Sequence, residues 1–358
     1  MRIALGMSGG VDSTICAMLL QAQGHEVIGL TMAKWNPQSG ILNADKRGCY
    51  GPSEPQAVQS AIQSAARLGI EHHMINLEQE FEREVLDYYR AAYVCGKTPN
   101  PCVVCNQKIK FGALLDKAMA SGIAFERFAT GHYARIRYDA DFGRWQLLKA
   151  KDPLKDQSYF LSGLSQDQLS FTLFPLGDMQ KSQIKTYAEN QGFDYLIKKK
   201  ESQDFLESYD KSPLFGESDA RPGYFMDRTG KILGTHKGLI HYTIGQRKGL
   251  GLAGFTQPQY VIAMDETTNT VFIGPEEELY SDALYVSEIN WLSIPEPQGE
   301  LHCQGKIRLA HEPVPCTVDK LSSGRHYVKF SERISAITPG QVIAFYDNEL
   351  VLGSGIIE

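Results

Sequence analysis

The chain has 358 residues, which is longer than most domains with a single hydrophobic core, so we expect two or three domains. Hydrophobic residues make up 42% and charged residues 22% of it, a balance that excludes a disordered or fibrous chain. The formal net charge of −6 does not favour a nucleic-acid-binding protein, although a local basic face suffices for phosphate contact.

The first 200 residues alternate between strand-like and helix-like segments. A helical stripe at i, i+3, i+4 and i+7 is formed by Ile15, Met18, Leu19 and Ala22, directly after the first apolar run. Alternating strands and helices predict an α/β fold whose parallel sheet is doubly wound and covered on both faces. The strands are expected at residues 2–7, 25–32, 72–77 and 125–130.

Beyond residue 200 the helical pattern fades, and Gly- and Pro-rich turns separate short β-like runs. These runs are expected at residues 231–233, 239–243, 260–264 and 271–273, and further on at 306–309, 316–321, 326–330 and 342–346. The change predicts a small mixed central domain and a C-terminal β-barrel. We therefore expect domains at residues 1–205, 206–278 and 279–358.

Nothing in the sequence indicates export or membrane insertion. No signal-peptide pattern opens it, and no apolar run is long enough to cross a bilayer. The seven cysteines are odd in number and scattered, which argues against the disulfide framework of a secreted protein. We expect a cytoplasmic protein without membrane contact, in which a close cysteine pair is catalytic or metal-binding.

The stretch Ser8–Ser13, SGGVDS, lies between the first predicted strand and the first predicted helix. Glycines there let backbone N–H groups approach phosphate oxygens, and the helix N-terminus adds a favourable dipole. Asp12 can bind Mg²⁺ beside the phosphates. The competing interpretation is a tight turn with a capping residue, but six consecutive residues in a strand–loop–helix context favour a phosphate site.

This hexapeptide is the SGGxDS motif, and the chain resembles the PP-loop ATP pyrophosphatases. The Gly-Lys-Ser/Thr of a Walker A loop is absent. The resemblance implies that ATP is cleaved between its α and β phosphates, which gives an adenylated substrate and pyrophosphate.

Further motifs narrow the resemblance. In this order, over nearly the whole chain, they are similar to those of the bacterial tRNA-specific 2-thiouridylases, which replace the C2 oxygen of the wobble uridine with sulfur. The motifs are TPNPCVVCN (98–106), ATGHY (129–133), KDQSYFL (155–161), YTIGQRKGLG (242–251), TPGQ (338–341) and LGSGIIE (352–358).

The resemblance implies an ATP site and a tRNA site. A methionine such as Met32 is, taken alone, more often a core residue, and a histidine such as His132 is more often structural. The functional interpretation of these residues therefore depends on the order of the motifs along the chain. The basic run Lys198–Lys200 is either a solvated face or a phosphate track. The implied ATP-binding residues are Gly6, Met7, Ser8, Gly9, Gly10, Val11, Asp12, Ser13, Met32 and Gly131. The implied tRNA-binding residues are Asn100, Pro101, His132, Lys155, Asp156, Gln157, Arg308 and Gln341.

The cysteines depart from the family pattern. The family has aspartate where Cys102 stands and a cysteine matching Cys105. It also has a second cysteine about a hundred residues on, where Leu206 or a neighbour stands here. The usual relay between two cysteines therefore cannot run in its standard form. Cys102 and Cys105, at i and i+3, can bring two thiolates to one metal centre, and Cys49 in a Gly- and Pro-flanked loop can supply a third.

The preferred hypothesis is a 4Fe–4S cluster on Cys49, Cys102 and Cys105 whose open iron holds sulfide. The first alternative is a persulfide on Cys105 with Cys102 or Cys49 as the resolving thiol, and the second is a structural zinc site. A third, of another class, is a non-catalytic tRNA-binding paralogue. The expected partners are tRNA and a sulfur donor, either sulfide or a persulfide-carrying protein. The other cysteines, Cys16, Cys95, Cys303 and Cys316, are expected to be buried as small apolar residues.

Overall fold

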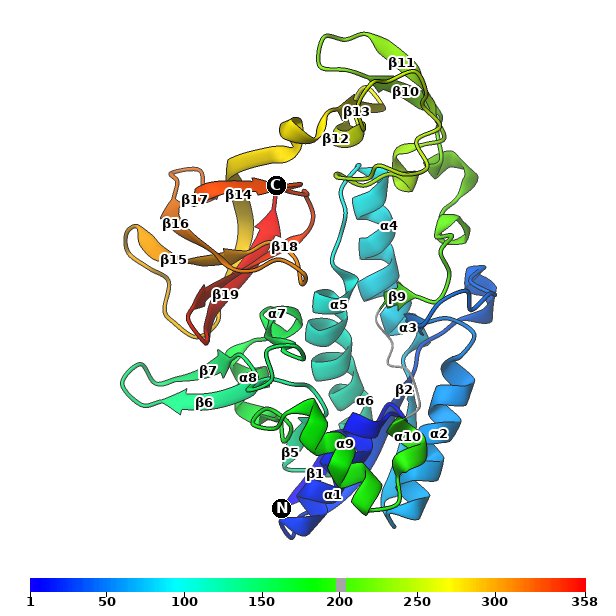
Figure 1. Cartoon of the computed structure of the whole chain (residues 1–358). Helices are drawn as coiled ribbons and strands as arrows, with labels where there is room; N and C mark the ends of the chain where they lie inside the picture. Colours follow the sequence, from blue (N-terminus) through cyan, green and yellow to red (C-terminus); the bar gives the residue numbers. More distant parts are fainter. Residues whose placement is uncertain (198–203) are drawn as a thin grey trace.

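The computed structural model describes residues 1–197 and 204–358, so the basic run Lys198–Lys200 lies outside the described residues. Figure 1 shows a helix-rich N-terminal part, a small strand-rich unit around β10–β13 and a second strand-rich unit that contains the C-terminus. No helix among the described residues has both the length and the apolar character needed to cross a membrane.

The N-terminal part is built on a parallel five-stranded sheet in the order β4-β2-β1-β5-β8. In the central strand, Ile3 and Leu5 pack into one apolar core while Ala4 packs into the other, because successive side chains point to opposite faces. This confirms the predicted doubly wound sheet. The strands are β1 Arg2–Gly6, β2 Glu26–Ala33, β4 Glu71–Asn76, β5 Arg127–Thr130 and β8 Thr172–Leu173.

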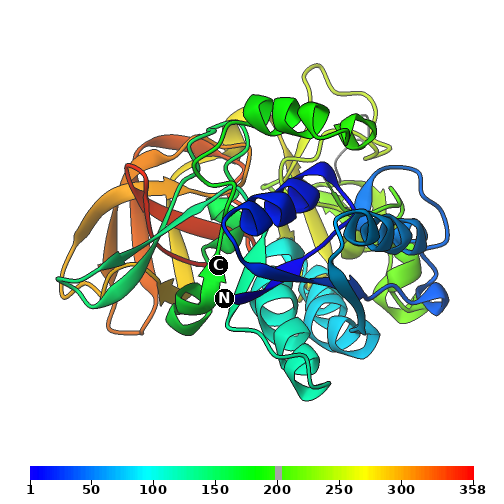
Figure 2. The same cartoon turned by 90° about the horizontal axis from the view of Figure 1, so that it is seen from below.

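Helices cover both faces of this sheet (Figure 2). One face carries α1 Val11–Ala22, α2 Glu54–Arg67, α9 Lys181–Asn190 and α10 Asp194–Ile197. The other face carries two longer helical segments, each with a π-helical stretch. They consist of α3 Glu78–Phe81, η2 Glu82–Leu86 and α4 Asp87–Val94, and of α5 Pro101–Val104, η3 Cys105–Ala113 and α6 Leu114–Ala120.

The central unit is a four-stranded sheet in the order β11-β10-β13-β12. The strand expected at residues 239–243 is wrong: a 3₁₀ turn, Leu239–His241, stands there. Leu239 and Ile240 are both buried, and consecutive buried side chains do not fit the alternation of a half-exposed strand. The strands are β10 Gly223–Met226, β11 Ile232–His236, β12 Tyr260–Asp265 and β13 Thr270–Gly274.

The C-terminal unit is a closed antiparallel barrel of six strands, in which β14 pairs with both β17 and β19. This confirms the predicted barrel, although the run expected at residues 306–309 lies past the end of its strand, at Lys306. The strands are β14 Tyr280–Trp291, β15 Leu301–Lys306, β16 Val314–Lys320, β17 His326–Ser335, β18 Val342–Asp347 and β19 Leu350–Ile357.

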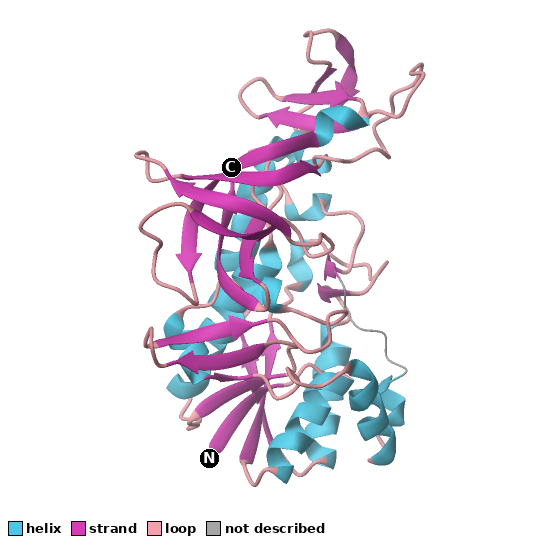
Figure 3. Cartoon of the chain, turned by 60° about the vertical axis from the view of Figure 1, so that its left-hand side comes forward, coloured by secondary structure: helices cyan, strands magenta, loops and turns pink. Residues whose placement is uncertain are grey.

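A hairpin that sequence analysis missed joins the N-terminal part to the barrel (Figure 3). It consists of β6 Arg135–Asp139 and β7 Arg144–Leu148, and β7 pairs with β19. The short helices α7 Ser158–Leu161 and α8 Gln166–Phe171 follow it. The first and last parts of the chain are therefore connected by β-sheet hydrogen bonds as well as by side chains.

Candidate active site

The predicted phosphate loop has the expected strand–loop–helix geometry. It leaves β1 at Gly6 and enters α1 at Val11, with Gly10 as the N-cap residue. Ser13 Oγ donates to the Gly10 carbonyl at 3.2 Å and accepts from the Ser8 N–H at 3.3 Å, so the two serines fix the loop from inside. The end of β1 is also hydrogen-bonded to β2, because the Met7 N–H donates to the Leu30 carbonyl at 2.8 Å.

Two glycines allow close backbone approach at this loop. Gly9 has φ +70°, and a Cβ there would lie 2.7 Å from the Ala57 carbonyl oxygen of α2. Gly131, which follows β5, would place a Cβ 3.1 Å from the Ser13 nitrogen. The structure therefore brings the predicted ATP-binding residues Gly131 and Ser13 side by side. Met32 lies near the end of β2, which pairs with β1 and is two strands from β5. Its side chain is half-buried against the apolar core.

The Asp12 carboxylate is engaged by two side chains that the sequence did not single out. Lys181 Nζ lies 2.6 Å from Asp12 Oδ1 and 2.7 Å from Oδ2. The Tyr133 hydroxyl donates to Asp12 Oδ1 at 2.7 Å. A lysine at the start of an amphipathic helix, such as Lys181, cannot be distinguished by sequence pattern from a surface lysine. Only the fold therefore reveals its ion pair with Asp12.

The predicted tRNA-binding residues Asn100 and Gln341 meet although 241 positions separate them. Gln341 Nε2 donates to the carbonyls of Thr98 and Pro99 at 3.0 Å each, and Asn100 Nδ2 lies 3.5 Å from Gln341 Oε1. Thr98 Oγ1 also lies 3.4 Å from Thr243 Oγ1 of the central unit. All three parts of the molecule therefore meet at the 98–106 segment, where Pro101 begins α5.

The 155–157 segment forms hydrogen bonds with Tyr133, the residue that follows His132. Gln157 exchanges two hydrogen bonds with Tyr133, at 2.9 and 3.0 Å. Asp156 accepts from the Ala150 N–H at 2.9 Å, and the Lys155 N–H closes a turn on Asp152. Arg308 is elsewhere, in the barrel, where Nη2 donates to the Ser335 carbonyl at 2.6 Å.

Cys49, Cys102 and Cys105 are neighbours in the fold. Burial raises the pKa of Cys102, and the charges of Cys49 and Cys105 raise it further. Burial raises the pKa of Cys105 to about 11, while Lys110 works in the opposite direction. The geometry agrees with these effects: Cys102 and Cys105 lie on the continuous segment α5–η3, and Tyr50, which follows Cys49, shares an apolar core with Cys105.

Two lysines stand beside these thiols. Although the Cys49 side chain is exposed, protein surrounds it closely enough that desolvation raises its pKa, against the charges of Lys34 and Lys110. Lys34 itself forms a nearly buried ion pair with Glu54 at 2.6 Å, in which each side chain is 10% exposed. Burial alone would lower the pKa of Lys34, but the Glu54 charge raises it. Lys110 and the Lys34–Glu54 ion pair therefore line the thiol site.

His132 links this lining to the phosphate loop. Lys110 Nζ lies 3.3 Å from His132 Nε2, and an ammonium group can only donate, so Nε2 accepts. The proton of the neutral ring is then on Nδ1, which donates to Thr130 Oγ1 at 2.7 Å. Burial, with a smaller effect of Lys110, holds the pKa of His132 well below its usual value, in agreement with a neutral ring.

Cys49 lies beside the strand that ends at Leu206, where the resemblance led us to expect a second cysteine at Leu206 or a neighbour. It is the middle residue of β3 Gly48–Tyr50, which pairs in parallel with β9 Asp204–Leu206, and Tyr50 stands opposite Leu206. Cys49 Sγ lies 3.5 Å from the Phe205 carbonyl oxygen. A Cβ on Gly48 would collide with the Leu206 backbone, so glycine permits this close approach. A thiol therefore lies on the strand that pairs with β9, although Cys49 and Leu206 point to opposite faces of the pair.

The expected cluster site is not formed as a metal site. Within residues 1–197 and 204–358, no group of three or more His, Cys, Asp or Glu side chains is arranged to hold a metal ion. A single ion held by all three thiols therefore has no ready-made group among these residues, and the 4Fe–4S cluster stays a prediction.

The remaining cysteines largely follow the prediction of burial. Cys16 and Cys316 are buried, and Cys303, half-buried, stands opposite Cys316 with the sulfurs 3.7 Å apart. The prediction is wrong for Cys95, which is exposed. It is the C-cap residue of α4, and its side chain lies beyond the apolar stripe of that helix.

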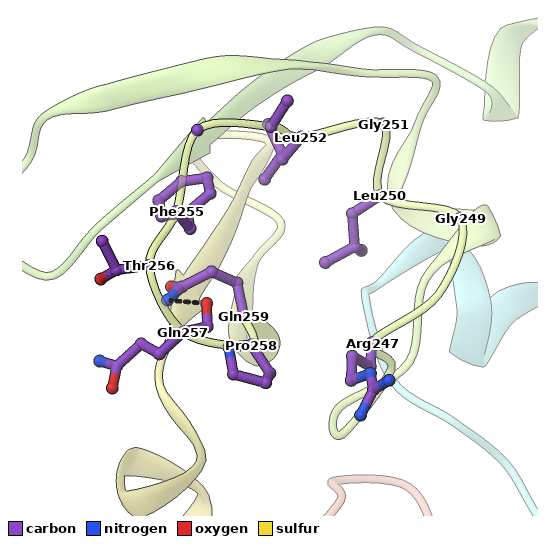
Figure 4. Close-up of a pocket in the computed structure, with 12 residues that line it drawn as sticks. Arg247, Gly249, Leu250, Gly251, Leu252, Phe255, Thr256, Gln257, Pro258 and Gln259 are labelled. Carbon is purple, nitrogen blue, oxygen red and sulfur yellow. Dashed lines mark hydrogen bonds between the residues drawn. The ribbon is translucent and has the colours of Figure 1, made fainter.

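The glycine-rich part of the 242–251 motif forms a surface loop in the central unit (Figure 4). Arg247 and residues 249–259 line a hollow of 490 Å³, into which Leu250 points and which Arg247 borders. The loop is held partly by its own bonds, such as that from Gln259 Nε2 to the Gln257 carbonyl at 3.3 Å. It places a basic side chain and an exposed aromatic ring, Phe255, on the surface.

Comparisons with known proteins agree with this architecture. Residues 1–206 match the family described as tRNA methyl transferase HUP domain, and residues 213–275 match its PRC-barrel domain. Residues 281–357 match the aminomethyltransferase β-barrel domain.

Relatives named tRNA-specific 2-thiouridylase MnmA match the entire chain. The protein from Geotalea uraniireducens is 43% identical over 364 residues, covering 100% of this chain and 95% of the relative. Those from Clostridium perfringens and Acetivibrio thermocellus are 41% and 40% identical over 362 residues, again covering 100% of this chain and 98% and 99% of the relatives. The chain therefore belongs to the tRNA-specific 2-thiouridylase family.

Proposed function

We propose that this protein uses ATP to replace the C2 oxygen of the wobble uridine of tRNA with sulfur. The observation that carries the proposal is the 129–133 segment, which touches both halves of the site. Gly131 packs against the phosphate loop, and the next residue, His132, bonds to Lys110 of η3, the helical segment that begins at Cys105. A nucleotide and a sulfur carrier would thus meet at one place.

The first step is adenylation of the base. The loop from Gly6 to Ser13 would hold the ATP phosphates, with Met32 and Gly131 beside adenine. The uridine C2 oxygen forms a bond to the α-phosphorus, and the bond to the β-phosphate breaks with its electron pair on pyrophosphate. Mg²⁺ that accompanies ATP would neutralise phosphate charge, and the Asp12 carboxylate is the oxygen ligand that the loop offers it.

The tRNA would lie across the junction of the three parts. Asn100 and Pro101 border the target base, with His132 on the side of the phosphate loop. Lys155, Asp156 and Gln157 shape one flank, and Arg308 and Gln341 of the barrel the other. Because Gln341 already fixes the 98–100 backbone, we expect its role to include holding the base-binding segment in place.

We assign sulfur transfer to the thiols themselves, because a second thiol on β3, which pairs with β9, can resolve a persulfide on Cys105. The Cys105 thiolate takes the outer sulfur of a donor persulfide, and the donor leaves as a thiolate. That sulfur attacks C2 of the adenylated uridine, and AMP leaves with the oxygen and the electron pair of the broken bond. The Cys49 thiolate then attacks Cys105 Sγ, leaving the outer sulfur on C2 and forming a disulfide that an external dithiol reduces with two electrons.

Cys49 is the proposed resolving thiol because β3 places it next to the strand that ends at Leu206. Iron and acid-labile sulfide analysis of anaerobically purified protein tests this choice. The thiol route predicts thiolation by iron-free protein supplied with a persulfide donor. Stoichiometric iron that disappears together with activity in Cys49→Ala would restore the cluster.

Pyrophosphate release from ATP tests catalysis against the alternative of a binding-only paralogue. Wild-type protein should release pyrophosphate in a tRNA-dependent manner, and Asp12→Ala should not, while its tRNA affinity stays intact. Wild-type protein that binds tRNA without releasing pyrophosphate would favour the paralogue.

A further inference from the structure

The hydrogen-bond ladder between β1 and β2 ends one rung short at the phosphate loop. The two strands are parallel, and one outer rung joins the Glu26 N–H to the Met1 carbonyl at 3.1 Å. The rung at the other end joins the Met7 N–H to the Leu30 carbonyl at 2.8 Å. In a parallel ladder, the next rung would run from the Met32 N–H to the Met7 carbonyl. Within the part of the chain that the structure describes, no backbone hydrogen bond joins these two groups, so the Met32 N–H stays out of the ladder.

A side chain takes the place of the missing donor. The Thr31 hydroxyl lies 2.7 Å from the Met7 carbonyl oxygen and 2.8 Å from His72 Nε2. A carbonyl can only accept, so the single hydroxyl hydrogen of Thr31 goes to Met7, and His72 Nε2 donates to the hydroxyl oxygen. Burial, with a smaller effect of the His73 charge, lowers the pKa of His72, in agreement with a neutral ring whose proton is on Nε2. Thr31 therefore holds the Met7 carbonyl, and His72 fixes the direction of the Thr31 hydroxyl.

A glycine within β2 makes room for this arrangement. A Cβ on Gly29 would lie 2.7 Å from Met7 Sδ and 2.8 Å from His72 Cδ2, so any side chain there would displace one of them. Thr31 is only 6% exposed, and burying its hydroxyl costs free energy that its two hydrogen bonds offset. Two apolar side chains would fill the same space without that cost. The polar pair is therefore best explained by its effect on the end of the ladder.

We propose that Thr31 and His72 are positioning residues, which keep the Met32 N–H open as a hydrogen-bond donor to a ring nitrogen of adenine. This inference rests on the ATP-dependent activation proposed above, in which Met32 lies beside adenine. Unprotonated ring nitrogens of adenine accept hydrogen bonds, and a backbone N–H in a strand is a donor of fixed direction. While Thr31 holds the Met7 carbonyl, the last rung stays open and the Met32 N–H remains available to the base.

Binding measurements on the full chain without tRNA test the proposal. Thr31→Val removes the hydroxyl and keeps the branched shape, so the Met32 N–H should close the rung on the Met7 carbonyl. The affinities for Mg·ATP, AMP and adenosine should then each fall about tenfold, the upper end of the usual effect of losing one hydrogen bond. The affinity for magnesium pyrophosphate should not change, because pyrophosphate lacks adenine. Thr31→Ser restores a hydroxyl and should recover most of the lost affinity.

Variants of His72 test the second half of the arrangement. His72→Leu lets the Thr31 hydroxyl rotate and should weaken adenosine binding less than Thr31→Val does. In the Thr31→Val background it should add no further loss, because the two residues act through one hydroxyl. His72→Gln keeps an N–H donor and should recover part of the affinity. The control is His73→Leu, the same substitution on the other face of β4, which should have no effect.

Amide hydrogen exchange at Met32 gives a readout that needs no ligand. Without nucleotide, this amide should exchange faster in wild-type protein than in Thr31→Val, where the new rung protects it. Equal exchange in the two proteins, or unchanged adenosine affinity in folded Thr31→Val protein, would overturn the proposal. An equal loss of pyrophosphate affinity would also overturn it, because the whole loop would then have loosened. Since neither tRNA nor a sulfur donor is present, a selective loss of adenosine affinity supports the proposal even if the protein fails to thiolate tRNA.

Discussion

Moving the second thiol from β3 to β9 is the sharpest perturbation that the structure suggests. Cys49→Ala should stop turnover, because the disulfide-linked adduct between Cys105 and the uridine sulfur then has no resolving thiol. Adding Leu206→Cys places a thiol on the paired strand β9, in the segment where the resemblance implies the second cysteine. The double variant should recover repeated turnover to within about tenfold of wild type, which corresponds to about 1.4 kcal/mol in the barrier.

The structure indicates how much stability this rescue costs. Leu206 is 5% exposed and belongs to the core that contains Tyr50 and Phe81. Truncating a buried leucine to alanine costs about 2–5 kcal/mol, and cysteine keeps a sulfur in the space, so we expect about 2 kcal/mol. A domain with a typical stability of about 5–15 kcal/mol stays folded after this loss, so reduced activity cannot be attributed to unfolding.

The assay counts 2-thiouridine formed per protein chain with a persulfide donor, a dithiol reductant and excess tRNA. Leu206→Cys alone should remain active, and Cys95→Ala, at an exposed cysteine, should match wild type. Repeated turnover by Cys49→Ala would refute the resolving role of Cys49. A folded double variant without turnover would refute the equivalence of the β3 and β9 positions.

Three further outcomes follow from charge and burial. Glu54→Gln leaves the Lys34 ammonium without its buried counter-charge and should lower the free energy of unfolding by about 3 kcal/mol in urea titrations. The control, Glu189→Gln at an exposed position, should change the free energy of unfolding little. Equal effects of the two substitutions would contradict the importance of this ion pair. Because burial raises the pKa of Cys105 to about 11, the rate of its alkylation should keep rising with pH from 7 to 10, and a plateau near pH 9 would contradict this. The affinity for tRNA should fall steeply as the salt concentration rises, despite the net charge of −6. Arg247→Gln should reduce the slope of the logarithm of the binding constant against the logarithm of the salt concentration by about one. An affinity independent of salt would exclude a basic contact face.

Sequence patterns predicted what depends on contiguous residues. The SGGVDS loop, the parallel sheet and the barrel each follow from local periodicity and turn residues, and the structure shows all three. The β6–β7 hairpin was missed because β6 is an edge strand with mostly exposed or half-exposed residues, so it lacks the apolar alternation that indicates a strand.

Features that depend on distant contacts were beyond the sequence. The grouping of Cys49 with Cys102 and Cys105 was expected, but the pairing of β3 with β9, which places Cys49 next to Phe205, links segments about 150 residues apart. The ion pair of Lys181 with Asp12 is of the same kind. The burial expected for Cys95 failed because a helix ends there, so its side chain falls outside the apolar stripe.

The central claim is that ATP and sulfur act on one uridine at one site. Its most direct test is nucleoside mass spectrometry of unmodified tRNA after incubation with purified protein, Mg·ATP, a persulfide donor and a dithiol. The proposed function predicts 2-thiouridine at the wobble position, with AMP and pyrophosphate formed in equal amounts. An absence of 2-thiouridine with active donor and folded protein, or its formation without ATP, would contradict the claim.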